Sequence, residues 1–311
     1  MSKYVFGVDV GGTTVKLGLF DVEGTVLDKW EIPTVTVEGG KHILPDITNS
    51  ILAKIAEKGI EKEEVAGCGI GVPGPVDSEG VVRKAVNLGW GIVQVEEDLS
   101  KMLGMPVKAG NDANVAALGE MWKGGGQGYK SIVMVTLGTG VGGGIIINGK
   151  IVTGSTGAAG EIGHIHVQEG EKEVCGCGNK GCLEQYASAT GIVRLANRKL
   201  ASSKKESVLR SGEISAKTVF DAVKAGDELA IEIAEQFGKY LGDALSGIAG
   251  VVNPEAIVIG GGVSKAGNVV IDYTEKYYQE NVFHGSRGTK FTLATLGNDA
   301  GIYGSAKMLL D

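Results

Sequence analysis

The stretch YVFGVDVGGTTVK, from Tyr4 to Lys16, joins an apolar run to a glycine-rich turn. A second apolar run extends from Val15 to Phe20, and a third begins at Val26 after a turn at residues 21–24. Apolar runs of this length between turn residues predict β-strands. The glycines have no Cβ, so the backbone of the turn can approach a ligand closely. The stretch therefore predicts a β-meander with a glycine-rich first hairpin.

The same pattern recurs later in the chain. An apolar run from Ile132 to Leu137 precedes Gly138, Thr139 and Gly140, and another run extends from Val141 to Ile147. Aligning Gly11 with Gly138 superposes the two units, which suggests a duplicated domain. Two unrelated hairpins are the alternative. Two lobes with such hairpins would hold a polyphosphate through backbone N–H groups, and at this level the sequence resembles the actin-like and hexokinase-like ATPases.

Length and charge restrict the function classes. A chain of 311 residues is long enough for two domains. The net charge of −7 argues against a nucleic-acid partner, because binding to the phosphate backbone relies on a basic surface. No run approaches the ~20 apolar residues that cross a bilayer, and the first ten residues do not match a signal peptide. We therefore expect a cytoplasmic protein with no membrane partner.

The glycine loops decide the nucleotide-binding class. Gly138-x-Gly140-x-x-Gly143 has the letters of a dinucleotide fingerprint, but it opens a strand where the fingerprint must open a helix. No P-loop motif occurs. In the first loop Asp9 precedes small residues that can wrap phosphates, and we expect it to hold Mg²⁺ through water; a turn-capping aspartate is the alternative. The loop residues concerned are Gly11, Gly12, Thr13, Thr14 and Lys16.

Asn111 and Asp112 lie between a short strand that starts at Val107 and a helical stretch that starts at Ala113. This position predicts that Asp112 lies at or near a helix N-cap. The same carboxylate is suited to phosphoryl transfer, in which a weak base accepts the proton of the attacking hydroxyl. A helix N-terminus keeps such a carboxylate ionised, so the capping and catalytic roles are compatible.

The most specific local signal is a histidine followed by three closely spaced cysteines. His164, Cys175, Cys177 and Cys182 provide one imidazole and three thiolates, which is the ligand set of a closed structural zinc site. His166 is a rival for the histidine position. Cysteines grouped in this way in a reducing compartment favour a metal over disulfides.

Two glutamates accompany the predicted metal loop. Glu161 lies three residues before His164, and Glu184 lies two residues after Cys182. A metal in this loop would fix both carboxylates, and ionised carboxylates accept hydrogen bonds from adjacent sugar hydroxyls. Two solvated glutamates are the alternative, since this is the usual state of the residue.

Seven motifs together resemble the ROK family of sugar kinases and sugar-responsive repressors, and they occur in family order over nearly the whole chain. They are Asp9-x-Gly-Gly-Thr-x-x-Lys16, Gly71-Val-Pro-Gly-Pro75, Gly110-Asn-Asp112, Leu137-Gly-Thr-Gly-Val-Gly142, Gly160-Glu-Ile-Gly-His164, Cys175-x-Cys-Gly-x-x-Gly-Cys-Leu-Glu184 and Gly260-Gly-Gly-Val-Ser264.

The resemblance implies an α/β fold of the two-lobed actin-like or hexokinase-like (ribonuclease H-like) type, closing over ATP and sugar. It implies a small lobe of residues 1–109 and 297–311 and a large lobe of residues 110–296. By position, Asp112 is the expected base, and the phosphates are expected at the loops of Gly11 and Gly138. The expected sugar ligands are Asn111, Asp112, Glu161, His164 and Glu184, with His164 also on zinc, and Gly261 and Gly262 are expected near the adenosine.

Two further segments, Asn87-Leu-Gly-Trp90 and Gly297-Asn-Asp-Ala-Gly-Ile-Tyr-Gly-Ser305, are most similar to bacterial glucokinases. The resemblance implies ATP-dependent phosphorylation of glucose at its 6-hydroxyl by a homodimer or homotetramer. The alternatives are an N-acylhexosamine or N-acetylmannosamine kinase, a sugar-responsive repressor without its DNA-binding domain, and a non-catalytic actin-like ATP-binding module. Asp9 lies too early in the sequence for a preceding helix-turn-helix domain.

Overall fold

The computed structural model describes residues 2–310, which form an α/β fold in two compact units. The first unit contains Met1–Gly128, Gly144–Gly160 and Leu296–Asp311, and the second contains Tyr129–Gly143 and Glu161–Thr295. The lobe boundaries expected from the sequence stay a prediction. Among the described residues, no helix is both long and apolar enough to cross a membrane.

The first five-stranded sheet has the order β3-β2-β1-β4-β7. Strand β1 pairs with β2 antiparallel and with β4 parallel, and β4 pairs with β7 parallel. The predicted meander is therefore confirmed, and two parallel strands extend it. The strands are β1 (Tyr4–Val10), β2 (Thr14–Asp21), β3 (Val26–Pro33), β4 (Val65–Val72) and β7 (Val107–Asn111).

The second five-stranded sheet has the order β10-β9-β8-β11-β12, which repeats the order of the first sheet strand for strand. Strand β11 pairs in parallel with β8 and with β12, as β4 does with β1 and β7. This correspondence confirms the duplicated core. The strands are β8 (Ile132–Leu137), β9 (Val141–Ile147), β10 (Lys150–Ile151), β11 (Ala256–Gly260) and β12 (Lys290–Leu293). A small separate sheet pairs β5 (Val81–Val82) with β6 (Val93–Gln94).

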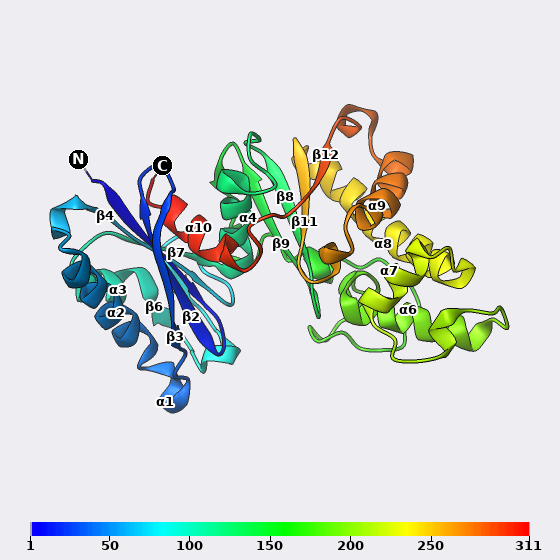
Figure 1. The fold of residues 1–311 in the computed structure, drawn as a ribbon, viewed down its shortest axis with the longest axis horizontal. Helices are drawn as coiled ribbons and strands as arrows, with labels where there is room; N and C mark the ends of the chain where they lie inside the picture. The colour runs from blue at the N-terminus through cyan, green and yellow to red at the C-terminus, as the bar shows by residue number, and fades with distance from the viewer. Residues whose placement is uncertain (1, 311) are drawn as a thin grey trace. The chain divides into compact units, whose positions relative to one another are not determined.

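Helices complete both units (Figure 1). The α-helices are α1 (Val37–Gly40), α2 (Ile43–Lys58), α3 (Val95–Leu103), α4 (Asp112–Lys123), α5 (Glu184–Ala187), α6 (Ala189–Ser202), α7 (Ala216–Lys224), α8 (Glu228–Val252), α9 (Asn268–Asn281) and α10 (Ala300–Lys307). Short 3₁₀ helices cover Lys62–Glu64, Val86–Leu88, Ile162–His164, Val208–Arg210, Val263–Ala266, His284–Ser286 and Gly297–Asp299.

Strand β1 of the first sheet is buried on both faces. Successive residues of a strand point to opposite faces, and β1 follows this rule. Phe6 and Val8 belong to the large core cluster that includes residues of α2 and α3, whereas Val5 packs with Ile302 and Ala306 of α10. Figure 1 shows α2 and α3 on one side of this sheet and α10 on the other. This explains why β1 is a continuous apolar run without alternation.

Helix α10 approaches its neighbours at backbone distance. A Cβ on Gly304 would lie 1.7 Å from the carbonyl oxygen of Val115 in α4, and a Cβ on Gly69 would lie 1.7 Å from that of Ser305. Gly7 of β1 meets the carbonyl of Ile302 in the same way. The hydroxyl of Ser305, which is fully buried, donates to the carbonyl oxygen of Val8 at 2.7 Å. Glycine on both sides of these contacts is what allows the helix to lie so close.

The long helix of the second unit, α8, has a defined cap at each end. The Asp227 side chain caps α8 by accepting from the N–H of Ala230. The helix ends at Asn253, which has the left-handed conformation (φ 45°) and is followed by a proline. Gly238 and Gly242 of α8 allow α9 to pack against it, because a Cβ on either would lie under 3 Å from the backbone of α9.

We predict opposite effects for two Gly→Ala substitutions in helices. Gly304→Ala should destabilise the first unit by at least about 1–3 kcal/mol, because the new methyl meets backbone that cannot move away. Gly247→Ala in α8 has open space around the new Cβ and should stabilise by about 0.5–1 kcal/mol. Thermal midpoints of the two variants and the wild type test this; equal midpoints for Gly304→Ala and the wild type would contradict the packing.

Candidate active site

Three parallel strands of the first unit end at the same edge of the sheet. In the register, Asp9 of β1 pairs with Gly71 of β4, and Gly71 pairs with Gly110 of β7. The segments that follow these positions are the Gly11 hairpin, the loop of Gly71–Pro75 and the start of α4. Ligands of open α/β sheets bind outside the carboxyl ends of the strands. The topology thus brings three of the sequence motifs together within one unit.

Two hydrogen bonds to Gly11 fix the base of the first glycine hairpin, while its tip is exposed to solvent. The N–H of Gly11 donates to the carbonyl of Thr14 at 3.0 Å, while the Thr34 hydroxyl donates to the carbonyl of Gly11 at 2.7 Å. Gly12 and Thr13 are exposed. The ammonium of Lys16 donates to the carbonyl of Asn298 at 2.9 Å.

Asp9 lies partly buried at the end of β1. Burial and the nearby carboxylate of Asp112 raise the pKa of Asp9 to about 6, although Lys16 acts in the opposite direction. Helix α10 contacts this carboxyl group, since a Cβ on Gly301 would lie 2.5 Å from its Cγ. Two neighbouring carboxylates favour a cation beside them. These residues therefore fit Mg²⁺, which prefers oxygen ligands.

Asn111 is the N-cap of α4, and Asp112 is the first residue of the helix. The Asn111 carbonyl oxygen accepts from the N–H groups of Ala113 (3.0 Å) and Asn114 (3.2 Å). Its amide donates to the carbonyl of Gly74 at 3.1 Å and to Asp112 Oδ1 at 3.0 Å. Asp112 thus lies beside the N-cap, within the range that the sequence predicted; the cap itself is Asn111, which also positions the Asp112 carboxylate.

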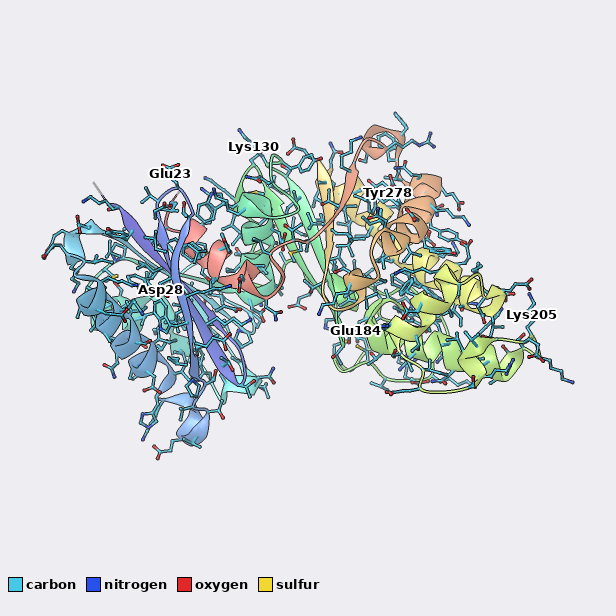
Figure 2. All side chains as sticks on the ribbon, viewed as in Figure 1. Glu23, Asp28, Lys130, Glu184, Lys205 and Tyr278 are labelled. Atoms are coloured by element: carbon cyan, nitrogen blue, oxygen red, sulfur yellow. The ribbon has the colours of Figure 1, made fainter. Side chains whose placement is uncertain are left out.

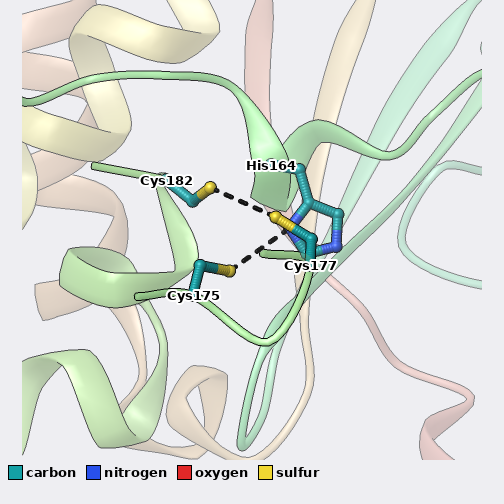
Figure 3. A group of neighbouring side chains, drawn as sticks. All are labelled: His164, Cys175, Cys177 and Cys182. Carbon is teal, nitrogen blue, oxygen red and sulfur yellow. Dashed lines mark hydrogen bonds between the residues drawn. The ribbon is translucent and has the colours of Figure 1, made fainter. Parts of the chain in front are cut away.

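The predicted metal ligands come together in the second unit (Figure 3). Ligand atoms of His164, Cys175, Cys177 and Cys182 all lie within 4.8 Å of one another. The sulfurs of Cys177 and Cys182 are 3.6 Å apart, and His164 Nδ1 is 3.7 Å from the Cys175 sulfur. His166 lies outside this group, with its Nδ1 2.9 Å from the carbonyl oxygen of Lys180. The cluster can hold a structural metal in a four-ligand site.

The thiols of this cluster differ in their environments. Burial raises the pKa of Cys175 to about 12 and also raises that of Cys182, whereas the backbone N–H of Asn179 lowers the pKa of Cys177. Buried thiolates are costly without a nearby positive charge. A divalent cation supplies that charge, so the donor set fits a metal better than three free thiols.

Both predicted glutamates lie beside the same imidazole. Glu161 Oε2 is 4.0 Å from His164 Nε2, and Glu184 Oε1 is 3.8 Å from His164 Nδ1. Glu184, the first residue of α5 (Figure 2), also accepts from the Cys175 thiol at 2.9 Å. The loop therefore joins two carboxylates that are 23 positions apart in the sequence.

The loop of residues 161–184, which carries the cysteine cluster, is stabilised by an ion-pair network that was not predicted from the sequence. The Glu171 side chain, only 4% exposed, accepts from both terminal nitrogens of Arg198 at 3.0–3.1 Å and from the Tyr186 hydroxyl. Glu173 pairs with Arg194 at 2.6 Å. The spacing of the two arginines, four residues apart on α6, places them on one helix face. This spacing of two arginines is the sequence feature from which the ion-pair network could have been predicted.

The second glycine hairpin packs on the start of α6. The carbonyl of Gly138 accepts from the N–H of Ala189 at 2.8 Å, and the carbonyl of Thr139 accepts from the Thr190 hydroxyl at 2.7 Å. A polar cavity of about 300 Å³ lies beside it. Its lining includes Thr139, Gly140, Cys175, Glu184 and Arg194. Within the second unit, the Gly138 hairpin and the loop with the cysteine cluster thus line the same cavity.

Gly261 and Gly262 follow β11 and border a second cavity. Gly261 has φ +83°, and a Cβ on it would lie 2.6 Å from the backbone of Leu137, which precedes the second hairpin. Gly262 lines a cavity of about 380 Å³, together with Ala189, Ser215, Lys217, Val263 and Lys265. This volume can take a purine nucleoside. The residues from positions 189 and 215–217 were not foreseen, because they reach the cavity only through the tertiary fold.

Comparison with known proteins gives full-length matches. The family model described as ROK family matches residues 5–311. A glucokinase from Halalkalibacterium halodurans is 42% identical over 308 residues, covering 97% of this chain and 93% of that protein. A glucokinase from Thermotoga maritima is 38% identical, covering 98% and 96%. A solved structure of a ROK family glucokinase from Streptomyces griseus, in complex with glucose and AMPPNP, aligns with a TM-score of 0.72 and 34% identity over 98% of each chain.

The buried carboxylate of Glu171 should stabilise the protein in a pH-dependent way. Arg198 lowers the pKa of Glu171, so the stabilisation is present above the ordinary pKa of a glutamate and is lost as the pH falls below it. Glu171→Gln should lower stability at neutral pH by about 1–3 kcal/mol, and the difference from the wild type should shrink in acid. Thermal unfolding at pH 7 and pH 4 measures both.

Glu169→Gln is the matched control, because the Glu169 side chain is 95% exposed in the same loop. Its midpoint should equal that of the wild type, since exposed ion pairs contribute little. A Glu171→Gln midpoint that also matched the wild type would mean that the network does not hold the loop.

Proposed function

The chain belongs to the ROK family, and we propose that it is a glucokinase that transfers the γ-phosphoryl group of ATP to the 6-hydroxyl of glucose. The observation that carries this proposal is the similarity to glucokinases along nearly the whole chain, at 35–42% identity. The Streptomyces griseus relative, aligned over 98% of each chain, was solved with glucose and an ATP analogue. The N-acylhexosamine kinase and repressor alternatives have less support.

Asp112 is the proposed catalytic base. Its carboxylate accepts the proton of the 6-hydroxyl while the oxygen forms a bond to the γ-phosphorus, and the bond to the β-phosphate oxygen breaks to release ADP. The position of Asp112 in the first turn of α4 supports this role, because the helix N-terminus favours the ionised form. Asn111 orients the carboxylate through its 3.0 Å hydrogen bond.

Sugar binding is proposed for Asn111, Asp112, Glu161, His164 and Glu184, as the family resemblance implies. The two glutamates lie on either side of the His164 ring and carry acceptor oxygens, which suit the hydroxyls of a hexose. Asn111 already makes four hydrogen bonds within the protein, so its contribution to sugar binding is mainly to position Asp112.

Nucleotide binding is proposed for the two glycine hairpins and for the cavity beside Gly262. Exposed backbone N–H groups at the hairpin tips suit phosphate oxygens, and the 380 Å³ cavity suits the adenosine. Mg²⁺, held by Asp9 through water, would neutralise charge on the β- and γ-phosphates. The proposed nucleotide ligands are Asp9, Gly11, Gly12, Thr13, Thr14, Lys16, Gly138, Thr139, Gly140, Gly261 and Gly262.

The cluster of His164 and the three cysteines is proposed to hold a structural zinc ion, which orders Glu161 and Glu184. The four-ligand sulfur and nitrogen set supports zinc in particular. Thiols kept for a metal suit the cytoplasm, which is the proposed location. A homodimer or homotetramer is proposed from the family resemblance, and light scattering of the purified protein measures its mass.

The first experiment is an ADP-release assay with MgATP and a panel of sugars: glucose, mannose, fructose, N-acetylglucosamine and N-acetylmannosamine. The proposal requires the highest kcat/KM for glucose. Asp112→Ala should then lower kcat by about 10²- to 10⁴-fold, because a positioned base contributes that much. Asp272→Ala, at an exposed site on α9, should leave kcat unchanged. Preference for an acylated amino sugar, or full activity of Asp112→Ala, would refute the corresponding part of the proposal.

Metal removal gives a second test. Cys177→Ser should abolish zinc binding, measured by elemental analysis of the purified protein, and glucose affinity should fall with it because the two glutamates lose their anchor. Cys68→Ala is the control, since Cys68 is buried in the first unit and lies outside the cluster. If Cys177→Ser lost zinc but bound glucose as tightly as the wild type, the ordering role of the metal would be wrong.

A further inference from the structure

The cysteines of the chain differ in how far they are exposed to solvent. Cys68, Cys175 and Cys182 are buried, the last two at 5% and 1% exposure, whereas Cys177 is exposed. Oxidants attack the cysteine sulfurs that they can reach, and buried cysteines are inert. Cys177 is therefore the cysteine that is open to an oxidant in solution.

Cys177 lies at the tip of a short turn with a fixed base. The N–H of Cys175 donates to the carbonyl of Asn179 at 2.7 Å, and the N–H of Gly178 donates to the carbonyl of Cys175 at 2.9 Å. On either side of Cys177, a Cβ on Gly176 or Gly178 would meet no atom within 4 Å beyond its chain neighbours. The tip can therefore move without displacing packed side chains.

The sulfur of Cys182 lies within reach of this tip. It is 3.6 Å from the sulfur of Cys177, and a disulfide bond would bring the two closer by about 1.5 Å. Cys182 is itself fixed, because its N–H donates to the Gln185 side chain at 3.1 Å. The thiol of Cys175, by contrast, donates to Glu184 Oε1 at 2.9 Å. The pair best placed for a disulfide is thus the free tip and its fixed neighbour, Cys177 and Cys182.

The same two sulfurs are half of the donor set of the cysteine cluster. Once bonded to each other they are no longer thiolate ligands, and His164 and Cys175 alone leave a four-ligand site incomplete. Cys182 also lies two residues before Glu184, whose carboxylate is 3.8 Å from the His164 ring. Oxidation of Cys177 would therefore act on the loop that carries a proposed sugar ligand.

We propose that Cys177 is an oxidation site for hydrogen peroxide, and that a Cys177–Cys182 disulfide releases the metal and weakens sugar binding. The release of metal and the loss of sugar affinity rest on the proposed function. The Cys177 sulfur attacks one peroxide oxygen, the O–O bond breaks, and a sulfenic acid and one water form. The Cys182 sulfur then attacks the Cys177 sulfur, the S–O bond breaks, and a second water leaves. Two thiols thus lose two protons and two electrons to one peroxide molecule.

The first test treats the zinc-loaded wild-type protein with hydrogen peroxide. A chromogenic chelator should record the release of about one zinc ion per chain, and peptide mass spectrometry should find the Cys177–Cys182 disulfide. Dithiothreitol followed by zinc should restore the metal content, because a disulfide is reversible whereas sulfinic and sulfonic acids are not. Cys68→Ala is the control and should behave as the wild type, since this buried cysteine lies outside the cluster.

The order of the two steps is tested with Cys182→Ser, which keeps the sulfur that is attacked first and removes the second. Hydrogen peroxide should leave Cys177 of this variant as a sulfenic acid, which dimedone labels. Labelling of Cys175 in its place, or a Cys175–Cys177 disulfide in the wild type, would overturn the assignment. A wild type that keeps its zinc and forms no disulfide would overturn the oxidation site altogether.

Calorimetric titration with glucose, before and after peroxide treatment, tests the consequence for the sugar. The affinity should fall by at least about tenfold, as for the loss of a hydrogen bond to a charged group, and should return after reduction and addition of zinc. An affinity that the disulfide leaves unchanged would refute the link to sugar binding. Untreated protein without zinc or without affinity for glucose would contradict the proposed function, while the disulfide measurement would still decide on the oxidation site.

Discussion

The backbone contact between α10 and the elements beneath it is the constraint on which the first unit depends. Gly304 lies against α4, and Gly7 and Gly69 bring β1 and β4 against the same helix. Contacts at this distance admit no Cβ on the three glycines, so the relative positions of two strands and two helices are fixed together. Protein interiors are packed as densely as crystals, and displacements here are not absorbed locally.

The packing of α10 also determines the positions of the two aspartates of the site, Asp9 and Asp112. Asp9 is the last residue but one of β1, on which α10 lies, and Asp112 begins the helix that α10 contacts. Gly301 of α10 lies against the Asp9 carboxyl group. The second unit positions its carboxylates differently, since Glu161 and Glu184 depend on an irregular loop. That loop is held by the cysteine cluster and by the Glu171–Arg198 ion pair.

Local patterns in the sequence predicted the strands of the meander, the repeated hairpin and the grouping of His164 with three cysteines. Each of these depends on residues close in the sequence or on a spacing with a clear physical meaning. The sequence could not assign the cap to Asn111, because Asn and Asp are about equally good N-caps. The neighbours Gly301 and Asp9 were also out of reach, because only the tertiary fold brings them together.

The place of α10 in the chain has a consequence for synthesis on the ribosome. Residues 296–310 follow the whole second unit in the sequence, yet they cover the face of β1 that carries Val5. Chains emerge from the amino terminus, and domains generally fold as they appear. Here the order is inverted: β1 is synthesised before the second unit but keeps an open apolar face until α10 follows, so the first unit closes after the second.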